Sequence, residues 1–581
     1  PNLIKFINWF SAYNLAPKGL VLKMCFGDKN NIIKREKISQ IDIFTKYKNF
    51  NLNDEQKNAL KNLSSFEKGF KVSVLQGVTG SGKTVVYFER IKKIISKNKQ
   101  VLILLPEIFL TNQFKKRFND YFGYDPFIWH SKISLKKKRF IWQGVLTNKI
   151  KIVIGARSSL ALPFSKLGLI VVDEEHDASY KQEEGIIYNA RDMAILRASI
   201  ENIPVNLITS IPSLETYNNI KNKKYSVIKL EKRFDNYPFP ETEIINLNLE
   251  KLRNKNISSE TIKIVKTFLD KNNQVLFFVN RRGYSPLLIC KSCGFRHTCP
   301  NCSIYLTYHK LRNSLVCHHC GFHRKPEIKC KNNKSLCNFS MYGPGVEKVY
   351  DELREIFPNK NIKIVSSDYM SKKKEGEVIL DDMERNKIDI LIGTQMISKG
   401  FNFPKLNCIV VVDADFSGRG YDLRSAEKNI QLYNQLSGRA GRFSSNSKII
   451  YQTITPTHKT LKDLIINNPE KFLIDELELR KNNNLPPFKK LIAIIISSHD
   501  KDFSYNWARK LKLKLSHFSN LEVLGPVEAP IFKINKKYRM RILIRSNKKG
   551  FSHTSLANFL NNFKTSSKIK LTVDVDPINF N

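Results

Sequence analysis

The chain has 581 residues, which is more than one hydrophobic core usually supports and predicts about three or four domains. Its longest apolar runs, such as Val101–Leu105 and Leu491–Ile496, are far shorter than the roughly 18 to 20 residues that cross a bilayer. The stretch Pro1–Phe10 lacks the features of a signal peptide. These observations favour a soluble, cytoplasmic protein over a membrane-spanning or secreted one.

The charge balance of the chain is strongly basic. There are 97 lysines and arginines against 53 aspartates and glutamates, which gives a formal net charge of +44. A surface of this kind attracts polyanions by releasing their counterions, so nucleic acid is the natural partner. An AT-rich genome also inflates lysine and asparagine and accounts for much of the excess, so charge alone identifies no partner.

The predicted elements fall into successive units along the chain. Residues 1–50 are rich in lysine and asparagine and are expected to hold little core. From Leu52 to Leu230, apolar strand-like runs alternate with helical stretches, a pattern typical of a parallel sheet with helices on both faces. The pattern breaks near Lys232–Glu241 and then resumes, which predicts a second α/β unit. After Asn483–Lys490, three strand-like runs with an intervening helix predict a small α+β domain.

The first α/β unit contains GVTGSGKT at Gly77–Thr84, between a predicted strand and a predicted helix. That context is what a phosphate-binding loop requires, because its glycines let backbone N–H groups wrap phosphates at a helix N-terminus. In this arrangement Lys83 reaches the β- and γ-phosphates of ATP, and Thr84 is a ligand of Mg²⁺. The expected nucleotide contacts are Gly77, Thr79, Gly80, Ser81, Gly82, Lys83 and Thr84.

A predicted buried strand in LIVVDEEHD (Leu169–Asp177) ends at two adjacent carboxylates. Asp173 is expected to hold Mg²⁺, and Glu174 is expected to orient and deprotonate the attacking water. An acidic strand end alone is often a solvated turn. When it follows a phosphate loop in the same α/β unit, it favours a catalytic role.

The second α/β unit supplies the positive charge that phosphate transfer needs. The sequence QLSGRAGR at Gln435–Arg442 places Arg439 and Arg442 on one helical face, where they can stabilise the departing γ-phosphate. Two α/β units with ATP between them describe a motor whose cleft closes on nucleotide. The alternative is two unrelated nucleotide-binding folds in tandem.

The cysteines are clustered, with eight of the ten between Cys290 and Cys337. A cytosolic chain keeps its thiols reduced, so the clustering favours metal binding over disulfides. Three of the four pairs have C-x-x-C spacing, and eight thiolates suit two tetrahedral Zn²⁺ sites. Nearby histidines such as His297 are expected to face the surface or DNA, and the lone Cys25 and Cys408 are expected to be buried hydrophobes. The candidate zinc ligands are Cys290, Cys293, Cys299, Cys302, Cys317, Cys320, Cys330 and Cys337.

The order of these motifs resembles that of superfamily 2 helicases, and within them of the primosomal protein N′ (PriA) family of replication-restart helicases. The resemblance runs from about Leu52 to the C-terminus. In LNDEQKNAL, Gln56 takes the place of the glutamine that reads adenine in the family, and Gln435 is counted with the nucleotide-binding residues. Further matches are the DNA-tracking motifs at Leu104–Phe114 and Val153–Phe164, the aromatic-rich loop at Tyr180–Asp192, the second-lobe sequences FVNRRGY, LIGTQMISKGFNFP and RSAEKNIQLYNQLSGRAGR, and the C-terminal GPVEAPIFKINKKYRMRILI and DVDP.

The resemblance implies a fold class and a domain order. The expected fold is α/β, with two RecA-like parallel-sheet helicase lobes, a Cys-rich zinc-binding insertion in the second lobe and a small α+β C-terminal domain. The expected boundaries are 1–50 for a residual N-terminal DNA-binding and winged-helix remnant with its linker, 51–233 for lobe 1, 234–286 and 341–482 for lobe 2, 287–340 for the zinc insertion and 483–581 for the C-terminal domain.

The resemblance also implies an activity, which is ATP-driven 3′ to 5′ unwinding of DNA at stalled forks and D-loops, with reloading of the replisome. The implied cofactors are ATP, Mg²⁺ and two Zn²⁺. The implied partners are forked DNA, primosome proteins, the replicative helicase loader and the single-stranded-DNA-binding protein. DNA would be tracked through hydroxyls such as Thr111 and Thr394 and through Arg157, while bases are held by stacking.

Three departures from the family pattern bear on the motor. The family's N-terminal module that captures a DNA 3′ end and the winged helix after it are largely missing, with Ile7–Met24 resembling the junction between them, which puts fork recognition in question. The coupling motif Ser-Ala-Thr-Pro has Ile211 in place of its threonine, and the lost hydroxyl predicts weaker coupling of hydrolysis to unwinding. The aromatic-rich loop has Ile186 and Ile187 beside Tyr188, which leaves fewer rings to stack on DNA.

The family pattern also assigns the cysteines to two zinc ions. The middle pairs share one ion, which here means Cys299, Cys302, Cys317 and Cys320. The outer pairs share the other, which means Cys290, Cys293, Cys330 and Cys337, because Asn333 occupies the position of the family's fourth ligand. The outer site then recruits Cys337 through a wider loop, binds with three thiolates and water, or stands empty. We expect two zinc ions, with Cys337 as the fourth ligand of the outer site.

Three functions are compatible with these motifs. The first is an active DNA helicase, supported by the phosphate loop, the acidic strand end and the arginine pair. The second is a DNA-bound primosome assembly scaffold with a weakened helicase motor, suggested by Ile211 and the missing N-terminal modules. The third is an RNA-directed ATPase, which no feature favours. We expect the first.

Overall fold

The computed structural model describes most of the chain. Within the described ranges, no helix is long and apolar enough to cross a membrane. The described residues are 1–27, 50–65, 69–106, 112–234, 237–249, 256–279, 287–290, 297–300, 306–309, 313–316, 322–326, 339–342, 345–365, 373–395, 397, 403–414, 424–442, 444, 446–453, 456–457, 461–463, 468–518, 520–547, 553–563 and 566–579.

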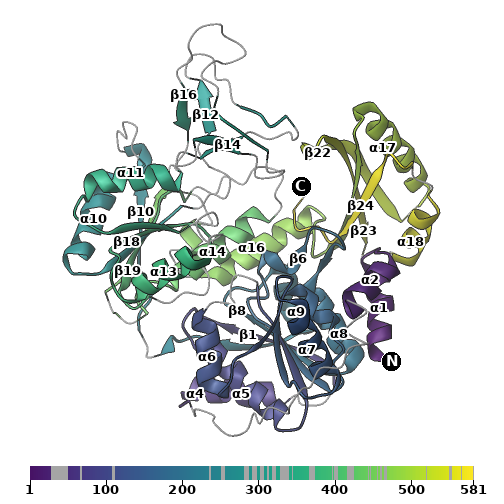
Figure 1. The fold of residues 1–581 in the computed structure, drawn as a ribbon, viewed down its shortest axis with the longest axis horizontal. Helices are drawn as coiled ribbons and strands as arrows, with labels where there is room; N and C mark the ends of the chain where they lie inside the picture. Colours follow the sequence, from purple (N-terminus) through teal and green to yellow (C-terminus); the bar gives the residue numbers. More distant parts are fainter. Residues whose placement is uncertain are drawn as a thin grey trace.

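The first sheet has seven parallel strands in the order β3-β4-β2-β5-β8-β1-β9 (Figure 1). Its central strands are buried along their whole length, and a hydrophobic cluster packs on each face of the sheet, as the alternating pattern predicts. The strands are β1 (Lys71–Gly77), β2 (Gln100–Leu104), β3 (Phe127–Trp129), β4 (Ile152–Gly155), β5 (Leu167–Val172), β8 (Pro204–Thr209) and β9 (Ser226–Leu230). The helices of this unit are α4 (Asp54–Ser64), α5 (Lys83–Ile95), α6 (Asn112–Phe122), α7 (Leu135–Leu146), α8 (Ala190–Glu201) and α9 (Leu214–Lys221).

The second sheet has six parallel strands in the order β10-β20-β19-β11-β18-β17. It too has a hydrophobic cluster on each face, so the predicted second α/β unit is confirmed. The strands are β10 (Glu241–Asn246), β11 (Gln274–Phe278), β17 (Ile362–Val365), β18 (Ile390–Gly393), β19 (Leu406–Val411) and β20 (Lys448–Thr453). The helices are α10 (Ser259–Asp270), α11 (Val346–Ile356), α13 (Lys373–Glu384), α14 (Ser425–Ser437) and α16 (Pro469–Asn482).

A small β-rich insertion lies between β11 and α11, at the top of Figure 1. Strands β12 (Leu287–Cys290) and β16 (Phe339–Tyr342) pair antiparallel where the chain leaves and rejoins the second unit. Between them, β13 (Thr307–His309), β14 (Ser314–Val316) and β15 (His323–Arg324) form a three-stranded antiparallel sheet. The strands of the insertion therefore form sheets of their own and do not join the six-stranded parallel sheet.

The C-terminal segment is an antiparallel sheet in the order β22-β23-β21-β24, with two helices packed on it. This arrangement confirms the predicted small α+β domain. The strands are β21 (Lys489–Ser498), β22 (Leu521–Ile534), β23 (Lys537–Asn547) and β24 (Lys570–Val575), and the helices are α17 (Lys501–Leu515) and α18 (His553–Asn562).

The N-terminal residues contradict the expectation that they hold little core. Helices α1 (Asn2–Tyr13) and α2 (Lys18–Phe26) bury Phe6, Phe10 and Cys25 in a cluster shared with the first sheet. Figure 1 shows both helices between the first sheet and the C-terminal domain, and the hydroxyl of Tyr13 donates to Asp576 at 2.5 Å. Composition misled here because a short helix needs only a few apolar residues, spaced on one face, to join an existing core.

Candidate nucleotide site and interlobe cleft

The glycine-rich loop lies where the sequence predicts it, between β1 and the start of α5. Gly80 and Gly82 have φ values of 91° and 81°, in the left-handed region that a side chain would disfavour. The ammonium group of Lys83 donates to the carbonyl oxygens of Gly77 at 2.7 Å and Val78 at 3.2 Å, so it lies over its own loop. Burial lowers the pKa of Lys83, and the nearby carboxylates of Glu174 and Asp173 oppose that shift.

Gln56 is built into the phosphate loop. It forms a reciprocal capping box with Asn53 at the start of α4, and its Nε2 donates to the carbonyl oxygen of Ser81 at 2.9 Å. A Cβ on Gly82 would lie 2.3 Å from that nitrogen, so the glycine makes room for the glutamine. The contact ties α4 to the loop.

The acidic pair follows β5, on the same edge of the sheet as the phosphate loop. Asp173 accepts a hydrogen bond from the Tyr87 hydroxyl at 3.0 Å, and the Tyr180 hydroxyl donates to the backbone carbonyl of Asp173 at 2.5 Å. Burial and the charge of Glu174 raise the pKa of Asp173 to about 7, against the opposing effects of Tyr87 and Lys83. Two crowded carboxylates of this kind suit a divalent cation, which would remove the cost of ionising both.

The C-terminal end of α14 lies against this edge of the first sheet. Gln435 Nε2 is 3.3 Å from Glu174 Oε2 and 3.0 Å from His176 Nε2. A Cβ on Gly438 would lie 2.0 Å from the Cβ of Thr79, so the two loops touch and only glycine fits at position 438.

The two arginines of the sequence QLSGRAGR lie in the same turn. Burial lowers the pKa of Arg439 to about 10, partly offset by Glu174. Burial and the neighbouring guanidinium groups of Arg439, Arg117 and Arg233 hold the pKa of Arg442 well below its usual value. Positive charge concentrated in this way beside a phosphate loop suits a polyphosphate ligand.

A polar relay connects Gln435 to the strand that precedes α9. His176 Nδ1 lies 2.7 Å from the Thr209 hydroxyl, which in turn donates to the carbonyl oxygen of Ile211 at 2.8 Å. Although Ile211 has no hydroxyl, the region keeps the hydroxyl of Thr209, two residues earlier. Sequence reasoning had no signal for it, because only the fold turns the Thr209 side chain towards His176.

The side chain of Ile211 has a different environment from the one that the sequence suggests. It is 1% exposed and packs in a cluster that joins residues of both α/β units. The buried members are Ile211, Leu214, Ile430, Phe472, Leu473 and Leu477. Isoleucine therefore makes an apolar contact between the two units.

Beside that cluster, charged side chains cross the same junction. Arg424 donates to both carboxylate oxygens of Glu215, at 2.9 and 2.6 Å, and the backbone N–H of Leu214 donates to Glu427 at 3.0 Å. Burial alone would raise the pKa of Glu215, but Arg424 holds it well below its usual value. Bidentate pairs fix orientation as well as distance, so the two units have a defined register here.

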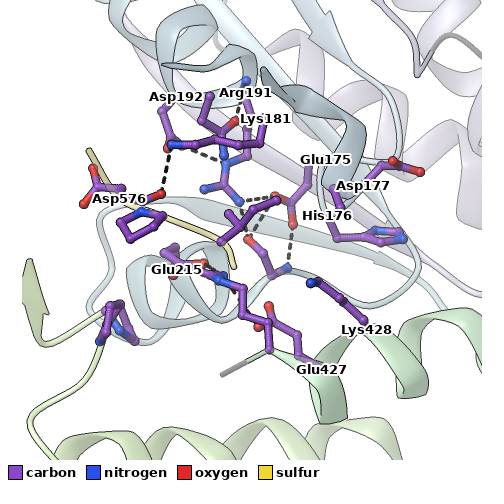
Figure 2. A pocket seen from close by; sticks show the side chains of 18 of the residues that line it. Glu175, His176, Asp177, Lys181, Arg191, Asp192, Glu215, Glu427, Lys428 and Asp576 are labelled. Atoms are coloured by element: carbon purple, nitrogen blue, oxygen red, sulfur yellow. Dashed lines mark hydrogen bonds and ion pairs between the residues drawn. The ribbon is translucent and has the colours of Figure 1, made fainter. Parts of the chain in front are cut away.

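Figure 2 shows Glu215 and Glu427 among the residues around a pocket of about 240 Å³. The pocket is lined by residues of both α/β units, of the C-terminal domain and of α1, and of the nucleotide-site residues it touches only His176. Its walls carry charges of both signs, including Glu175, Lys181 and Lys428. It is thus separate from the phosphate loop.

Known families match successive parts of the chain. Residues 49–224 match a model described as the res subunit of type III restriction enzymes, and residues 327–444 match the helicase conserved C-terminal domain. Residues 299–325 match the Cys-rich region of the PriA DNA helicase, and residues 481–578 match the primosomal protein N C-terminal domain.

Replication restart protein PriA of Rickettsia conorii is 39% identical over 583 residues, which cover 100% of this chain and 89% of that protein. This chain belongs to the PriA family. The PriA proteins of Haemophilus influenzae and Bacillus subtilis are 35% and 34% identical over 97% and 93% of this chain, and the matches cover 77% and 68% of those proteins. The two parallel-sheet units of this PriA-family chain are therefore the lobes of an ATP-dependent DNA helicase, as the motif order predicted.

Solved structures are more distant from this PriA-family chain. RecG bound to a three-way DNA junction is 16% identical with a TM-score of 0.44, over 74% of this chain and 47% of RecG. The helicase MrfA bound to DNA is 16% identical with a TM-score of 0.43, over 90% of this chain and 62% of MrfA. Likenesses at this level add nothing about substrate or mechanism.

The PriA-family aromatic-rich loop corrects one expectation. Tyr188, expected to be available for stacking on DNA, is fully buried and packs edge-on against Phe10, with 4.9 Å between the ring centroids. In the same loop, Lys181 lies 2.6 Å from the Asp574 carboxylate and donates to the carbonyl oxygen of Val575 at 2.7 Å. Arg157 holds the loop through the carbonyl oxygen of Lys181, at 2.8 Å. The loop is thus fastened to α1 and to β24.

The zinc ligands expected of a PriA-family member lie mostly outside the described residues. Cys299 is buried in a small cluster with Leu288, Leu306 and Leu315, and the backbone of Cys290 ends β12. Thr111 also lies outside the described residues. The remaining candidate ligands, which fall outside as well, are Cys293, Cys302, Cys317, Cys320, Cys330 and Cys337.

The two cysteines away from the cluster are buried, as expected. Burial raises the pKa of Cys25 to about 11 and that of Cys408 to about 12, so both thiols are protonated and behave as apolar groups.

Proposed function

We propose that this PriA-family chain is a DNA helicase that uses ATP to move 3′ to 5′, binds stalled forks and D-loops and promotes reloading of the replisome. The observation that carries the proposal is the contact of Gln435–Arg442 in the second lobe with the Lys83 loop and the Asp173–Glu174 pair in the first. The relatives' name, replication restart protein, supports the cellular role. The net charge of +44 supports a nucleic-acid substrate.

In this mechanism the phosphate loop binds the triphosphate through its backbone N–H groups, and Lys83 moves from the carbonyls of Gly77 and Val78 to the β- and γ-phosphates. A bound Mg²⁺ would offset the negative charge of the phosphates. Thr84 and Asp173 would hold the ion. The raised pKa of Asp173 supports that role, because a nearby cation would stabilise the ionised carboxylate.

Glu174 accepts the proton of the attacking water in this mechanism. Gln435 donates a hydrogen bond to Glu174 and holds its carboxylate in place beside the phosphate loop. Arg439 and Arg442 stabilise the charge that builds up on the departing γ-phosphate. Gln56 reads adenine, and its bond to Ser81 would connect base recognition to the conformation of the loop.

The zinc insertion would hold two Zn²⁺, one on Cys299, Cys302, Cys317 and Cys320 and one on Cys290, Cys293, Cys330 and Cys337. The match to the PriA Cys-rich region supports a zinc site. We further propose that forked DNA, primosome proteins, the replicative helicase loader and the single-stranded-DNA-binding protein are its partners. Because chromosomal DNA is the proposed substrate, the protein would work in the cytoplasm.

A DNA-bound primosome assembly scaffold with a weakened motor is the second candidate. Ile211, in place of the coupling threonine, favours it. The contact between His176 and Thr209 counts against it, because a hydroxyl still links the acidic motif to the strand before α9. Ile211 also makes an apolar contact between the lobes.

The experiment that separates these candidates measures ATP hydrolysis and strand displacement on a synthetic DNA fork. Lys83→Ala serves as the inactive control, and single-stranded RNA is added as a competitor. The proposal predicts DNA-stimulated hydrolysis together with displacement, both abolished by Lys83→Ala and neither blocked by RNA. Hydrolysis without displacement would support the scaffold, and a preference for RNA would contradict the proposed substrate.

A further inference from the structure

Arg233 lies on the connection that leaves the first sheet after β9, and its side chain reaches the second lobe. Its Nη2 donates to the carbonyl oxygen of Ser437 at 3.2 Å, and its Nη1 lies 3.4 and 3.1 Å from the carbonyl oxygens of Ala440 and Gly441. The guanidinium also stacks 4.7 Å from the ring of Phe239. Only 4% of Arg233 is exposed, so these contacts are made in a nearly water-free environment.

The acceptors of Arg233 lie at and just beyond the C-terminal end of α14. The last carbonyl groups of a helix have no partner within the helix, and they form the negative end of its dipole. A buried cation is favourable at that position. Burial lowers the pKa of Arg233 to about 10, so the group stays charged near neutral pH.

The same connection also touches the phosphate loop. The backbone N–H of Phe234 donates to the carbonyl oxygen of Gly80 at 2.9 Å. Gly438 lies directly against Thr79, one residue before Arg439. The Arg233–Phe234 pair therefore joins the loop that would bind the phosphates to the turn that carries the two arginines.

We propose that Arg233 is a positioning residue for ATP hydrolysis, whose side chain holds residues 437–442 against the phosphate loop. Arg439 and Arg442 then stand beside the γ-phosphate before the transition state forms. Charged groups that are positioned in advance need no reorganisation during the reaction, which is what makes them effective. This inference rests on the proposed ATPase function and assigns a role to a residue outside the recognised motifs.

The role of Arg233 makes a specific kinetic prediction. The phosphate loop binds ground-state nucleotide, whereas the arginines act on the transition state, so kcat should respond more than KM. In the 581-residue chain with saturating single-stranded DNA, we expect Arg233→Ala to lower kcat about ten- to a hundredfold and to change the KM for ATP less than about threefold. Arg233→Lys keeps the charge but loses the planar guanidinium. Its kcat should therefore lie between that of Arg233→Ala and that of the unmodified chain.

A second measurement separates positioning from simple stabilisation. The affinities of the variants for ADP and for ADP with aluminium fluoride, which mimics the transferred phosphoryl group, are compared. We expect Arg233→Ala to weaken binding of the mimic about as much as it lowers kcat, and to leave ADP binding nearly unchanged.

Arg197 offers a matched control. It is also buried and donates to two backbone carbonyls, those of Leu160 and Leu162, but within the first lobe. Arg197→Ala should lower the melting temperature without the selective loss of kcat. If Arg233→Ala fails to fold, Arg233→Lys decides, with an expected loss of several-fold in kcat.

Two negative results have distinct meanings. An unmodified chain without DNA-stimulated ATPase activity would contradict the proposed function itself. The role of Arg233 would be overturned if the unmodified chain is active and the Arg233 variants keep its kcat. It would also be overturned if they lose no more kcat than Arg197→Ala does at the same loss of melting temperature.

Discussion

Gln435 on α14 donates a hydrogen bond to Glu174 after β5, with 3.3 Å between Nε2 and Oε2, and the same nitrogen lies 3.0 Å from His176. One side chain of the second lobe thus contacts both the proposed catalytic carboxylate and the first member of the relay to Thr209. The second lobe is therefore linked to the position of Glu174 through Gln435.

Replacing Gln435 should separate hydrolysis from unwinding. We expect Gln435→Ala to lower DNA-stimulated kcat about tenfold and to reduce further the base pairs unwound per ATP, because both the carboxylate and the relay lose a contact. Gln452, fully buried on β20 and bonded to the backbone N–H of Ser258, is the matched control. Its alanine variant should lose stability but keep the ratio of unwinding to hydrolysis. If both alanine variants unwind the same number of base pairs per ATP, Gln435 does not couple hydrolysis to unwinding.

Placing at position 211 the threonine that the resemblance to the family implies should not improve the motor. Ile211→Thr places a hydroxyl in the apolar cluster between the lobes, so we expect the free energy of unfolding to fall by about 1 to 2 kcal/mol. Because Thr209 already contacts His176, the base pairs unwound per ATP should not rise. Chemical denaturation and a coupled unwinding assay measure the two quantities. A rise in unwinding per ATP would support the weakened-motor account.

Asp173 should make the nucleotide-free protein pH-sensitive. Its pKa is raised from 3.8 to about 7, so between these values the folded chain keeps a proton that the unfolded chain has released. The free energy of unfolding therefore falls as pH rises through this range. Above it, the full cost of ionising Asp173 in the folded chain is present.

The variant Asp173→Asn tests this dependence, because its side chain never ionises. In a metal chelator and without nucleotide, we expect the variant to melt above the unmodified chain at about pH 8 and close to it at about pH 5. Adding Mg²⁺ at the higher pH should raise the melting temperature of the unmodified chain only. A difference between the two proteins that is the same at both pH values would show that burial of Asp173 carries no such cost.

The zinc content should depend on Cys337. Native mass spectrometry of the 581-residue chain should find two Zn²⁺, and Cys337→Ser should weaken or remove one of them, because three thiolates bind less tightly than four. Cys25→Ser, far from the cluster and buried against the first sheet, should leave both ions in place. Two ions bound equally tightly in Cys337→Ser would show that Cys337 is not a ligand.

The sequence predicted those parts of the fold that rest on local patterns. Apolar runs such as Val101–Leu105 specify buried strands, and the spacing from Gly77 to Thr84 specifies a loop at the start of a helix. No local pattern encodes how two lobes meet. The proximity of Lys83, Glu174 and Arg439 was therefore predicted only from the order of the motifs and from the resemblance to the helicase family.

Other features depended on contacts between distant parts of the chain. Tyr188 looked available for DNA, but it is buried against Phe10, 178 positions away, which only the docking of α1 reveals. The hydroxyl of Thr209 and the carbonyl contacts of Arg233 were missed for the same reason. Thr209 lies two residues before Ile211 in the coupling motif and Arg233 lies outside the motifs, but the contacts of both residues depend on how the fold places their side chains.

Strand displacement on partial duplexes with a single-stranded arm of either polarity tests the central claim most directly. The account predicts that ATP drives displacement when the protein can load on a strand and move 3′ to 5′ into the duplex, and that Lys83→Ala abolishes it. Displacement only in the opposite direction, or none despite DNA-stimulated hydrolysis, would contradict it.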